Sequence, residues 1–307
     1  MQIGVMFDVD RPFDDVLAQV HHLAETGIEA AWTSQIFSYD ALTLLAVIGR
    51  EVPGIALGTA VVPTYPRHPV MMAGQALTVQ AATGGRLHLG IGLSHQVVIE
   101  NVFGMSFERP ARHMREYLSV LVPLLAGEPA AFAGETIRST TFGPLGVRAE
   151  APPVLVAALG ETMLRLAGRM ASGTITWMTG PQTVASHIIP TITEAAAEAG
   201  RPAPPPPSRE AWRETVLRHV AMQIEHRARQ HPAQPLEETE RLSVKELRKH
   251  LLWYTRGRRG GVAFRREAVR LVTAADVSAL IDLHFPPDQP FEVDAGFHPA
   301  DEAGEDP

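Results

Sequence analysis

Cysteine is absent from this chain of 307 residues. Its absence excludes disulfide bonds, thiolate metal sites and catalysis by a cysteine nucleophile. A chain without disulfide bonds also agrees with a cytoplasmic location, and we predict that location together with the absence of a metal site.

Long apolar runs are missing as well. No stretch approaches ~18 consecutive apolar residues, so we predict neither a membrane-spanning helix nor a membrane partner. The first residues, MQIGVMFDVDRP, lack the basic region and the apolar core of a signal peptide. With 45% apolar and 20% charged residues, the composition is that of a globular protein.

Basic residues are scarce in the first two thirds of the chain and concentrated later. Residues 1–200 contain 11 basic and 17 acidic side chains, whereas residues 241–270 contain 10 Lys and Arg against Glu246 and Glu267. From Asp282 onwards there are eight acidic residues and no Lys or Arg. The basic block indicates either a polyanion partner or helices with solvated basic faces.

Short apolar segments alternate with amphipathic ones along the first 200 residues. Six segments have the continuous apolar character of buried strands: 2–7, 28–34, 54–62, 86–92, 153–159 and 173–178. Six others have helical periodicity: 13–27, 41–52, 70–85, 109–127, 161–171 and 182–200. Residues 131–150 suggest an irregular or hairpin insertion. Buried strands that alternate with helices predict a parallel sheet covered by helices.

The number of these units indicates the fold class. Six successive strand–helix units favour an α/β barrel over an open doubly wound sheet, because no dinucleotide-type glycine fingerprint follows the first strand. We predict a TIM-barrel-like domain over residues 1–202 that has the first six units and lacks the last two. The proline run predicts a stiff linker at 203–209. Beyond it we predict a small helical bundle over 210–285 and an acidic, disordered tail over 286–307.

In a barrel, functional side chains lie in the loops at the carboxyl ends of the strands. Those loops contain Asp8; Ser34 and Gln35; Thr59, Ala60 and Val61; Gly92, Leu93, Ser94 and His95; Leu159 and Gly160; Met178, Thr179 and Gly180. Gly160 and Gly180 each stand directly before a helix, where free backbone N–H groups and the helix dipole favour a phosphate. The same glycines also suit plain turns between a strand and a helix.

The most distinctive stretch is GTAVVPTYPRHP at 58–69. Together with RLHLGIGLSHQ, RPARHMREYL, PVLVAALG and TITWMTGP, it makes residues 1–202 resemble the luciferase-like monooxygenase superfamily, in particular its coenzyme F-420-dependent oxidoreductases. The resemblance implies a TIM barrel that holds the deazaflavin ring of coenzyme F-420, or alternatively the ring of FMN, across the strand ends. It also implies hydride transfer between that ring and a small organic substrate.

The resemblance assigns roles to individual residues. It implies a cis peptide bond within Thr59–Ala60–Val61, behind the ring. It gives the remaining cofactor contacts to Gly92, Leu93 and Ser94 beside the ring, to Arg67 and His68 at the ring edge or tail, and to Ala158, Leu159, Gly160, Thr179 and Gly180 at the phosphate tail.

Histidine supplies the candidate for proton transfer. His95 is predicted to donate a proton or to contact the substrate, because histidine is the side chain that commonly exchanges protons near neutral pH; alternatively it is a loop histidine bonded to the backbone. His113 and Arg112 are expected at the surface, where they help to pack the insertion, rather than over the barrel mouth.

A second resemblance concerns the C-terminal part. Residues 240–285 are similar to the C-terminal helical domain of bacterial tRNA-dihydrouridine synthases, which implies a tRNA partner for residues 241–270. The matching basic and aromatic residues are Lys249, His250, Tyr254, Arg256 and Arg258. Since that family uses a catalytic cysteine, dihydrouridine synthesis itself is not expected here. A tRNA-binding protein and an inactive fusion remain as alternatives to the oxidoreductase, and related barrels suggest a homodimer.

Overall fold

Two units make up this chain. Contacts between residues divide it into residues 2–203 and residues 204–307, and each unit is described by itself. The structure is a computed structural model that describes residues 4–201, 208–255, 257–287 and 291.

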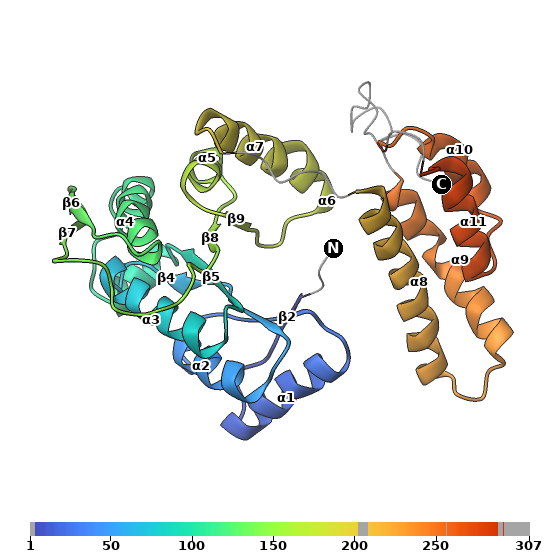
Figure 1. Ribbon diagram of the computed structural model, residues 1–307, viewed down its shortest axis with the longest axis horizontal. Coiled ribbons are helices and arrows are strands. Elements are labelled where there is room, and N and C mark those ends of the chain that lie inside the picture. Colours follow the sequence, from blue (N-terminus) through green and yellow to red (C-terminus); the bar gives the residue numbers. More distant parts are fainter. Residues whose placement is uncertain (1–3, 202–207, 256, 288–290, 292–307) are drawn as a thin grey trace. The chain divides into compact units, whose positions relative to one another are not determined.

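The first unit is built on one parallel sheet (Figure 1). Its main strands are β1 (Gly4–Met6), β2 (Ala30–Thr33), β3 (Ala56–Thr59), β5 (Leu87–Gly92), β8 (Val154–Ala157) and β9 (Gly173–Ile175). They pair in the order β1-β2-β3-β5-β8-β9, and the short strand β4 (Val62–Pro63) also pairs with β5. All these pairs are parallel, which confirms the arrangement predicted from the alternation of strands and helices.

Helices cover one face of this sheet. They are α1 (Phe13–Glu25), α2 (Ala41–Glu51), α3 (Pro69–Ala82), the π-helix η1 (Val98–Val102), α4 (Pro110–Leu125), α5 (Glu161–Met170), α6 (Pro181–Thr183), the π-helix η2 (Val184–Ile188) and α7 (Ile189–Glu198). Leu57, Leu89 and Val156 on the strands are fully buried in one core with Met72 on α3 and Leu121 on α4. Because burying each such side chain stabilises the fold by about 1.5–3 kcal/mol, the apolar stripe of each helix decides which face meets the sheet.

The predicted insertion is a hairpin. Strands β6 (Ala131–Ala133) and β7 (Arg138–Thr140) pair antiparallel after α4. This outcome confirms the hairpin alternative and leaves the parallel sheet uninterrupted.

The sheet is an incomplete barrel. It begins at β1 and ends at β9, and in the described part of the chain no strand follows β9. The predicted fold class, six strand–helix units of a TIM-barrel-like domain followed by helices, is therefore confirmed. Since the strands are parallel, all their carboxyl ends lie at the same edge, where the connecting loops can form one site.

The second unit is helical. Its helices are α8 (Arg209–Gln230), α9 (Leu236–Tyr254), α10 (Gly261–Ala268) and α11 (Ala274–His284). Ser208 caps α8 by accepting a hydrogen bond from the Ala211 N–H. The helix therefore begins at Arg209, one residue before the predicted start of the helical bundle at 210 and within the predicted linker. Val216, Val244, Leu247 and others form a core of their own. The predicted tail lies almost wholly outside the described residues.

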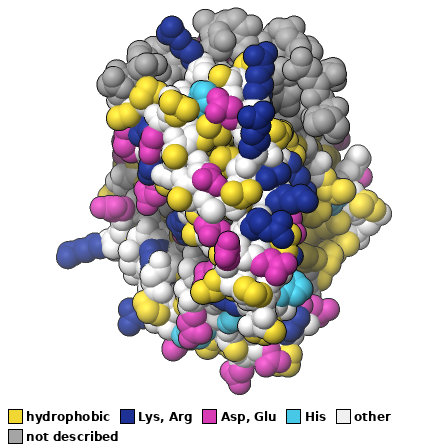
Figure 2. Space-filling model, turned by 90° about the vertical axis from the view of Figure 1, so that its right-hand side faces the viewer, with side chains coloured by type: hydrophobic (Ala, Val, Ile, Leu, Met, Phe, Trp, Pro, Cys, Tyr) yellow, Lys and Arg dark blue, Asp and Glu magenta, His cyan; other side chains and the backbone are white. Residues whose placement is uncertain are grey.

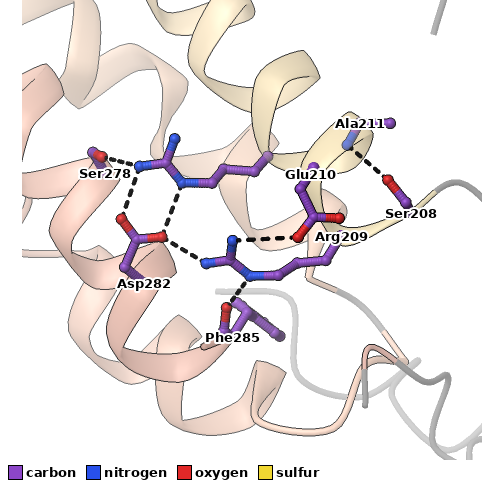
Figure 3. Close-up of polar contacts among 8 residues, drawn as sticks. Ser208, Arg209, Glu210, Ala211, Ser278, Asp282 and Phe285 are labelled. Carbon is purple, nitrogen blue, oxygen red and sulfur yellow. Dashed lines mark hydrogen bonds and ion pairs between the residues drawn. The ribbon is translucent and has the colours of Figure 1, made fainter. Parts of the chain in front are cut away.

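Ion pairs join the first and last helices of this unit. Asp282 of α11 accepts hydrogen bonds from Arg209 and Arg213 of α8, and Figure 3 shows the bond from Arg209. The Arg209 side chain is only 9% exposed, and its guanidinium also donates to the Phe285 carbonyl. On the face drawn in Figure 2, Lys and Arg lie among Asp, Glu and apolar side chains. Much of the basic charge therefore serves packing and ion pairs within the unit.

Candidate active site

A cavity of about 480 Å³ opens at the carboxyl ends of β2, β3 and β5. The loop after β2 contributes Ser34, Gln35, Ile36 and Phe37; the segment after β3 contributes Val61, Pro63, Pro66 and Arg67; the loop after β5 contributes Ser94, His95, Val98 and Phe103. The cavity has the size of a small-molecule site, and most of its walls are apolar. The structure thus brings together four predicted site residues: Val61, Arg67, Ser94 and His95.

The backbone between β3 and β4 has the predicted geometry. The peptide bond between Ala60 and Val61 is cis, within the tripeptide implied by the family resemblance. The Val61 carbonyl accepts a hydrogen bond of 3.1 Å from the Gln35 N–H, which joins this segment to the loop after β2. At Gly92, a Cβ atom would lie 2.6 Å from Val61 Cγ2. Glycine is therefore required where the end of β5 passes Val61.

Thr59 has a structural role in the sheet. Its side chain is fully buried, and the hydroxyl both donates to the Gly90 carbonyl and accepts from the Gly90 N–H, each at 2.8 Å. The hydroxyl thus replaces a backbone partner where β3 diverges from β5, and it is not exposed to the cavity. Ala60 and Leu93 are partly buried beside the cavity without being among its lining residues.

One end of the Arg67 guanidinium is held by Asp40 and Gln35. It is 18% exposed, and its Nη2 pairs with the Asp40 carboxylate and lies 3.3 Å from Gln35 Oε1. Burial alone would raise the pKa of Asp40, but hydrogen bonds from Thr43 and the charge of Arg67 lower it, so the carboxylate stays ionised. The Nη1 group of Arg67 is enclosed and has no hydrogen-bond partner within the described residues.

His68, the neighbouring prediction, is already engaged. Its Nδ1 accepts from the Val70 N–H at the start of α3, and its Nε2 lies 3.2 Å from the Arg138 carbonyl. It lines an adjoining cavity of about 650 Å³ instead of the first one, and shares that wall with Arg67. Both ring nitrogens are therefore used to hold α3 and the hairpin.

Ser94 and His95 both line the cavity, but Ser94 has an unusual backbone conformation and His95 has an exposed side chain. Ser94 has φ = 63°, a left-handed conformation that is uncommon outside glycine and often occurs at functional sites. The His95 side chain is exposed, and within the described residues its imidazole has no hydrogen-bond partner. Its carbonyl accepts hydrogen bonds from the Val98 and Ile99 N–H groups, which fixes the turn into η1.

The predicted phosphate-tail residues form a separate group at the ends of β8 and β9. Gly160 is the N-cap of α5 and Gly180 the N-cap of the three-residue α6. A Cβ atom at either glycine would meet no other atom within 4 Å, so the space in front of both is open. Thr179 donates to the Trp177 carbonyl, and the Leu159 carbonyl lies 3.1 Å from His187 Nε2. Ala158 is buried.

A polar and aromatic cluster beside the cavity was not predicted. His113 is 5% exposed, its ring stacks on Tyr65 with centroids 3.9 Å apart, and its Nε2 lies 3.1 Å from Thr64 Oγ1. Burial lowers the pKa of His113 to about 4, although the charge of Glu116 opposes this shift. The expectation of a surface position for His113 was wrong, because the ring fills a gap between α4 and the 64–65 segment. Arg112 does pair with Glu135 of the hairpin, as expected.

Glu116 anchors the hairpin to α4. Its carboxylate accepts hydrogen bonds from the backbone N–H groups of Glu135, Thr136 and Ile137 and from the Thr136 hydroxyl. Burial would raise the pKa of Glu116, but these donors lower it to about 2. Nothing in the sequence marked this residue, because its donors are supplied by backbone that is about 20 residues away.

The residues predicted to contact tRNA are largely packed inside the helical unit. The Arg258 guanidinium lies 3.8 Å from the ring centroid of Phe291, the Tyr254 hydroxyl bonds His219, and the His250 ring packs between His219 and Trp253. Lys249 is exposed. Arg256 lies outside the described residues.

The described residues include no group of three or more His, Asp or Glu side chains suited to a metal ion. Nor does that part of the chain contain a helix with the length and hydropathy needed to cross a membrane.

Fold and site together define an α/β barrel-type protein whose loops enclose a small-molecule cavity at the carboxyl ends of parallel strands. The chain belongs to the luciferase-like monooxygenase family, whose sequence model it matches over residues 1–275. It is 28% identical over 179 residues to the 5,10-methylenetetrahydromethanopterin reductase of Archaeoglobus fulgidus, an alignment that covers 57% of this chain and 52% of that protein. The chain spans about half the length of the curated relatives it matches.

Two solved structures have a similar fold. The coenzyme F-420-dependent tetrahydromethanopterin reductase from Methanopyrus kandleri superposes with a TM-score of 0.58 at 19% identity, covering 91% of this chain and 82% of that one. A type II Baeyer–Villiger monooxygenase from Pseudomonas putida, in complex with FMN, superposes with a TM-score of 0.56 at 16% identity, covering 92% and 83%. These identities are low, so the likeness concerns the fold alone.

The family match changes the interpretation of the C-terminal part. It runs to residue 275 and so includes helices α8, α9 and α10. The resemblance of this part to tRNA-dihydrouridine synthases is therefore not supported. Basic and aromatic residues at helical spacing also occur in ordinary bundle helices, which is why the pattern was a poor marker of RNA binding.

Proposed function

We propose that this chain binds coenzyme F-420, or FMN in its place, and takes part in hydride transfer to or from a small organic substrate. The observation that carries this proposal is the cavity at the ends of β2, β3 and β5. When bound, such a ring supplies the hydride chemistry, and the protein contributes binding, orientation and the exclusion of water.

The residues present fit a planar tricyclic ring. The cavity volume lies within the range of about 300–1,000 Å³ that is usual for small-molecule sites. Val61 lines the cavity, and Gly92 adds no side chain that would push Val61 further into it. In this proposal Gly92, Leu93 and Ser94 lie beside the ring, and Arg67 contacts its edge.

The ends of β8 and β9 fit the phosphate tail. Gly160 is the N-cap of α5, no side chain caps this helix end, and the helix dipole there favours an anion. A Cβ atom at Gly160 or Gly180 would meet no other atom within 4 Å. Ala158, Leu159 and Thr179 complete this group. His95, which is exposed at the cavity, is the residue proposed to donate a proton to the substrate or to contact it.

A titration with each cofactor tests the proposal. Purified protein is titrated with coenzyme F-420 and separately with FMN, and the quenching of ring fluorescence is followed. We expect saturable binding with a Kd of about 1 µM or tighter, which corresponds to about −8 kcal/mol. If neither ring binds, the proposed function is wrong for this chain.

A matched pair of variants tests the tail site. Gly160 has extended backbone angles and open space around it, so Gly160→Asp and Gly160→Asn should both fold, and both side chains are good N-caps. The aspartate adds a negative charge where the phosphate is proposed to lie. We expect Gly160→Asp to bind the cofactor about tenfold more weakly than Gly160→Asn, a difference of about 1.4 kcal/mol. Equal affinities would place the phosphate elsewhere.

A further inference from the structure

The chain segment 64–67, between β4 and α3, forms a wall that two cavities share. Pro66 and Arg67 line both the cavity of about 480 Å³ and the adjoining cavity of about 650 Å³. Thr64 and Tyr65 line only the second of them. The Thr64 N–H donates to the carbonyl of the last residue of β5, and the Arg67 N–H closes a turn by donating to the Thr64 carbonyl. A shift of this wall would therefore change the shape of the first cavity.

One end of the wall is held by Tyr117 of α4. The Tyr117 side chain is fully buried, and its hydroxyl donates a hydrogen bond of 2.9 Å to the backbone carbonyl of Arg67. Burial raises the pKa of Tyr117, so the hydroxyl keeps its proton and remains a donor. Because the acceptor is a backbone carbonyl, this bond fixes the course of the chain at Arg67.

The other end is held by His113, four residues earlier on the same helix. Residues at this spacing lie on one face of a helix, and the centroids of the His113 and Tyr117 rings are 5.8 Å apart. The His113 ring stacks on Tyr65, and its Nε2 lies 3.1 Å from Thr64 Oγ1. Neither His113 nor Tyr117 lines the cavity of about 480 Å³, so each acts on that cavity through the wall.

We propose that Tyr117 and His113 are positioning residues for the cofactor ring, which hold the 64–67 wall where the bound ring requires it. This inference rests on the proposed function, because it concerns the binding of the ring in the same cavity. A displacement of about 1 Å that a distant substitution causes can cost an enzyme about 100-fold in rate. Side chains that never touch the ring can therefore decide how well it binds.

Two matched tyrosine variants test the proposal. Tyr117→Phe removes only a hydroxyl that donates to the Arg67 carbonyl, and Tyr39→Phe removes one that donates to the Arg11 carbonyl, although Tyr39 lines neither cavity. In cofactor titrations we expect Tyr117→Phe to bind the ring about fivefold more weakly than the unaltered protein, and Tyr39→Phe to bind it within about twofold. Unchanged affinity in Tyr117→Phe, or an equal loss in Tyr39→Phe, would overturn the proposal.

The absorbance spectrum of the bound ring separates positioning from a loss of stability. A less stable variant has fewer folded molecules, but those molecules bind the ring in the same surroundings. We expect the absorbance maximum of the bound ring to shift in Tyr117→Phe and in His113→Phe, because a displaced wall changes those surroundings, and to stay unchanged in Tyr39→Phe. Identical spectra in all three variants would contradict a positioning role.

Hydrogen exchange tests the wall itself in the protein without cofactor. The Arg67 N–H should exchange faster in Tyr117→Phe than in the unaltered protein, whereas the N–H groups of α4 should exchange at the same rate. Unchanged exchange at Arg67 would show that the Tyr117 hydroxyl does not hold the wall.

The cofactor titrations also separate this inference from the function on which it rests. If the ring binds equally well to the unaltered protein and to Tyr117→Phe, the positioning role is wrong and the proposed function stands. If neither ring binds to the unaltered protein, the proposed function is wrong and this inference falls with it.

Discussion

The two units use buried polar side chains in different ways. In the strand-built unit, Glu116 and His113 fasten loops and a hairpin around the site, through backbone N–H groups and an aromatic stack. In the helical unit, the buried Arg209 of α8 pairs with the partly exposed Asp282 of α11 and so joins one helix to another. Polar side chains thus shape the surroundings of the cavity in the first unit, whereas in the second unit they hold the helices of the bundle together.

The largest effect is expected from Glu116→Ala. The change leaves three backbone N–H groups and one hydroxyl without their acceptor, and each unsatisfied buried group costs about 1–3 kcal/mol. Because the hairpin can partly relax towards water, we expect a total loss of about 4 kcal/mol in the free energy of unfolding, measured by urea denaturation. Glu116→Gln, which keeps one acceptor oxygen, should lose less than half as much; an equal loss would contradict the hydrogen-bond account.

The next effect depends on pH and concerns His113. Its pKa is about 4 in the folded unit and near 6.5 in the unfolded chain, so only the unfolded chain gains a proton between those values. Stability should therefore fall by about 3 kcal/mol as the pH decreases from 6.5 to 4, and remain constant above 6.5.

His113→Phe provides the control for that titration. It keeps the ring that stacks on Tyr65 and removes the titrating group, so the dependence on pH attributable to this site should disappear. Because burial also lowers the pKa of His219 and His250 in the helical unit, the two units are best followed separately, by hydrogen exchange of α4 and of α9. An unchanged pH profile of α4 in His113→Phe would assign the titration to another group.

A smaller loss is expected from Asp282→Ala in the helical unit. The change leaves Arg209 and Arg213 without their shared carboxylate, but Asp282 is 43% exposed and water can replace part of the interaction. We expect the free energy of unfolding of the helical unit to fall by about 2 kcal/mol. Hydrogen exchange should become faster in α8 and α11 and stay unchanged in β5. Glu225→Ala, which breaks an exposed pair with Arg229, should change stability by less than about 0.5 kcal/mol.

The smallest expected effect is a difference in stability between variants of Arg258 and Lys249, two residues of the C-terminal part that the second resemblance assigned to tRNA binding. Arg258→Ala removes a guanidinium packed on aromatic rings and should destabilise the helical unit by about 1 kcal/mol. Lys249→Ala changes an exposed side chain and should stay within about 0.5 kcal/mol of the original stability. Equal effects of the two changes in thermal melts would show that Arg258 does not support the packing.

Local patterns in the sequence were enough to predict the strand–helix order, the absence of strands among the described residues after 200, and the edge of the sheet where the candidate site lies. These features follow from local patterns, since continuous apolar runs make buried strands and the carboxyl ends of parallel strands share one edge. The same patterns marked Gly160 and Gly180 as candidate phosphate contacts before a helix. The position of the cis peptide bond and the roles of the other residues at the strand ends came from the family resemblance, because local patterns do not encode them.

Which side chains meet depends on the folded arrangement of the whole unit. Arg67 pairs with Asp40 27 residues away, and His113 stacks on Tyr65 from a helix that the sequence placed at the surface. Tertiary packing likewise placed Arg258 against Trp212 and Phe291, where a family resemblance had suggested an RNA contact. Partners this far apart in sequence are chosen by packing and by the burial of polar groups, and neither leaves a local pattern in the sequence.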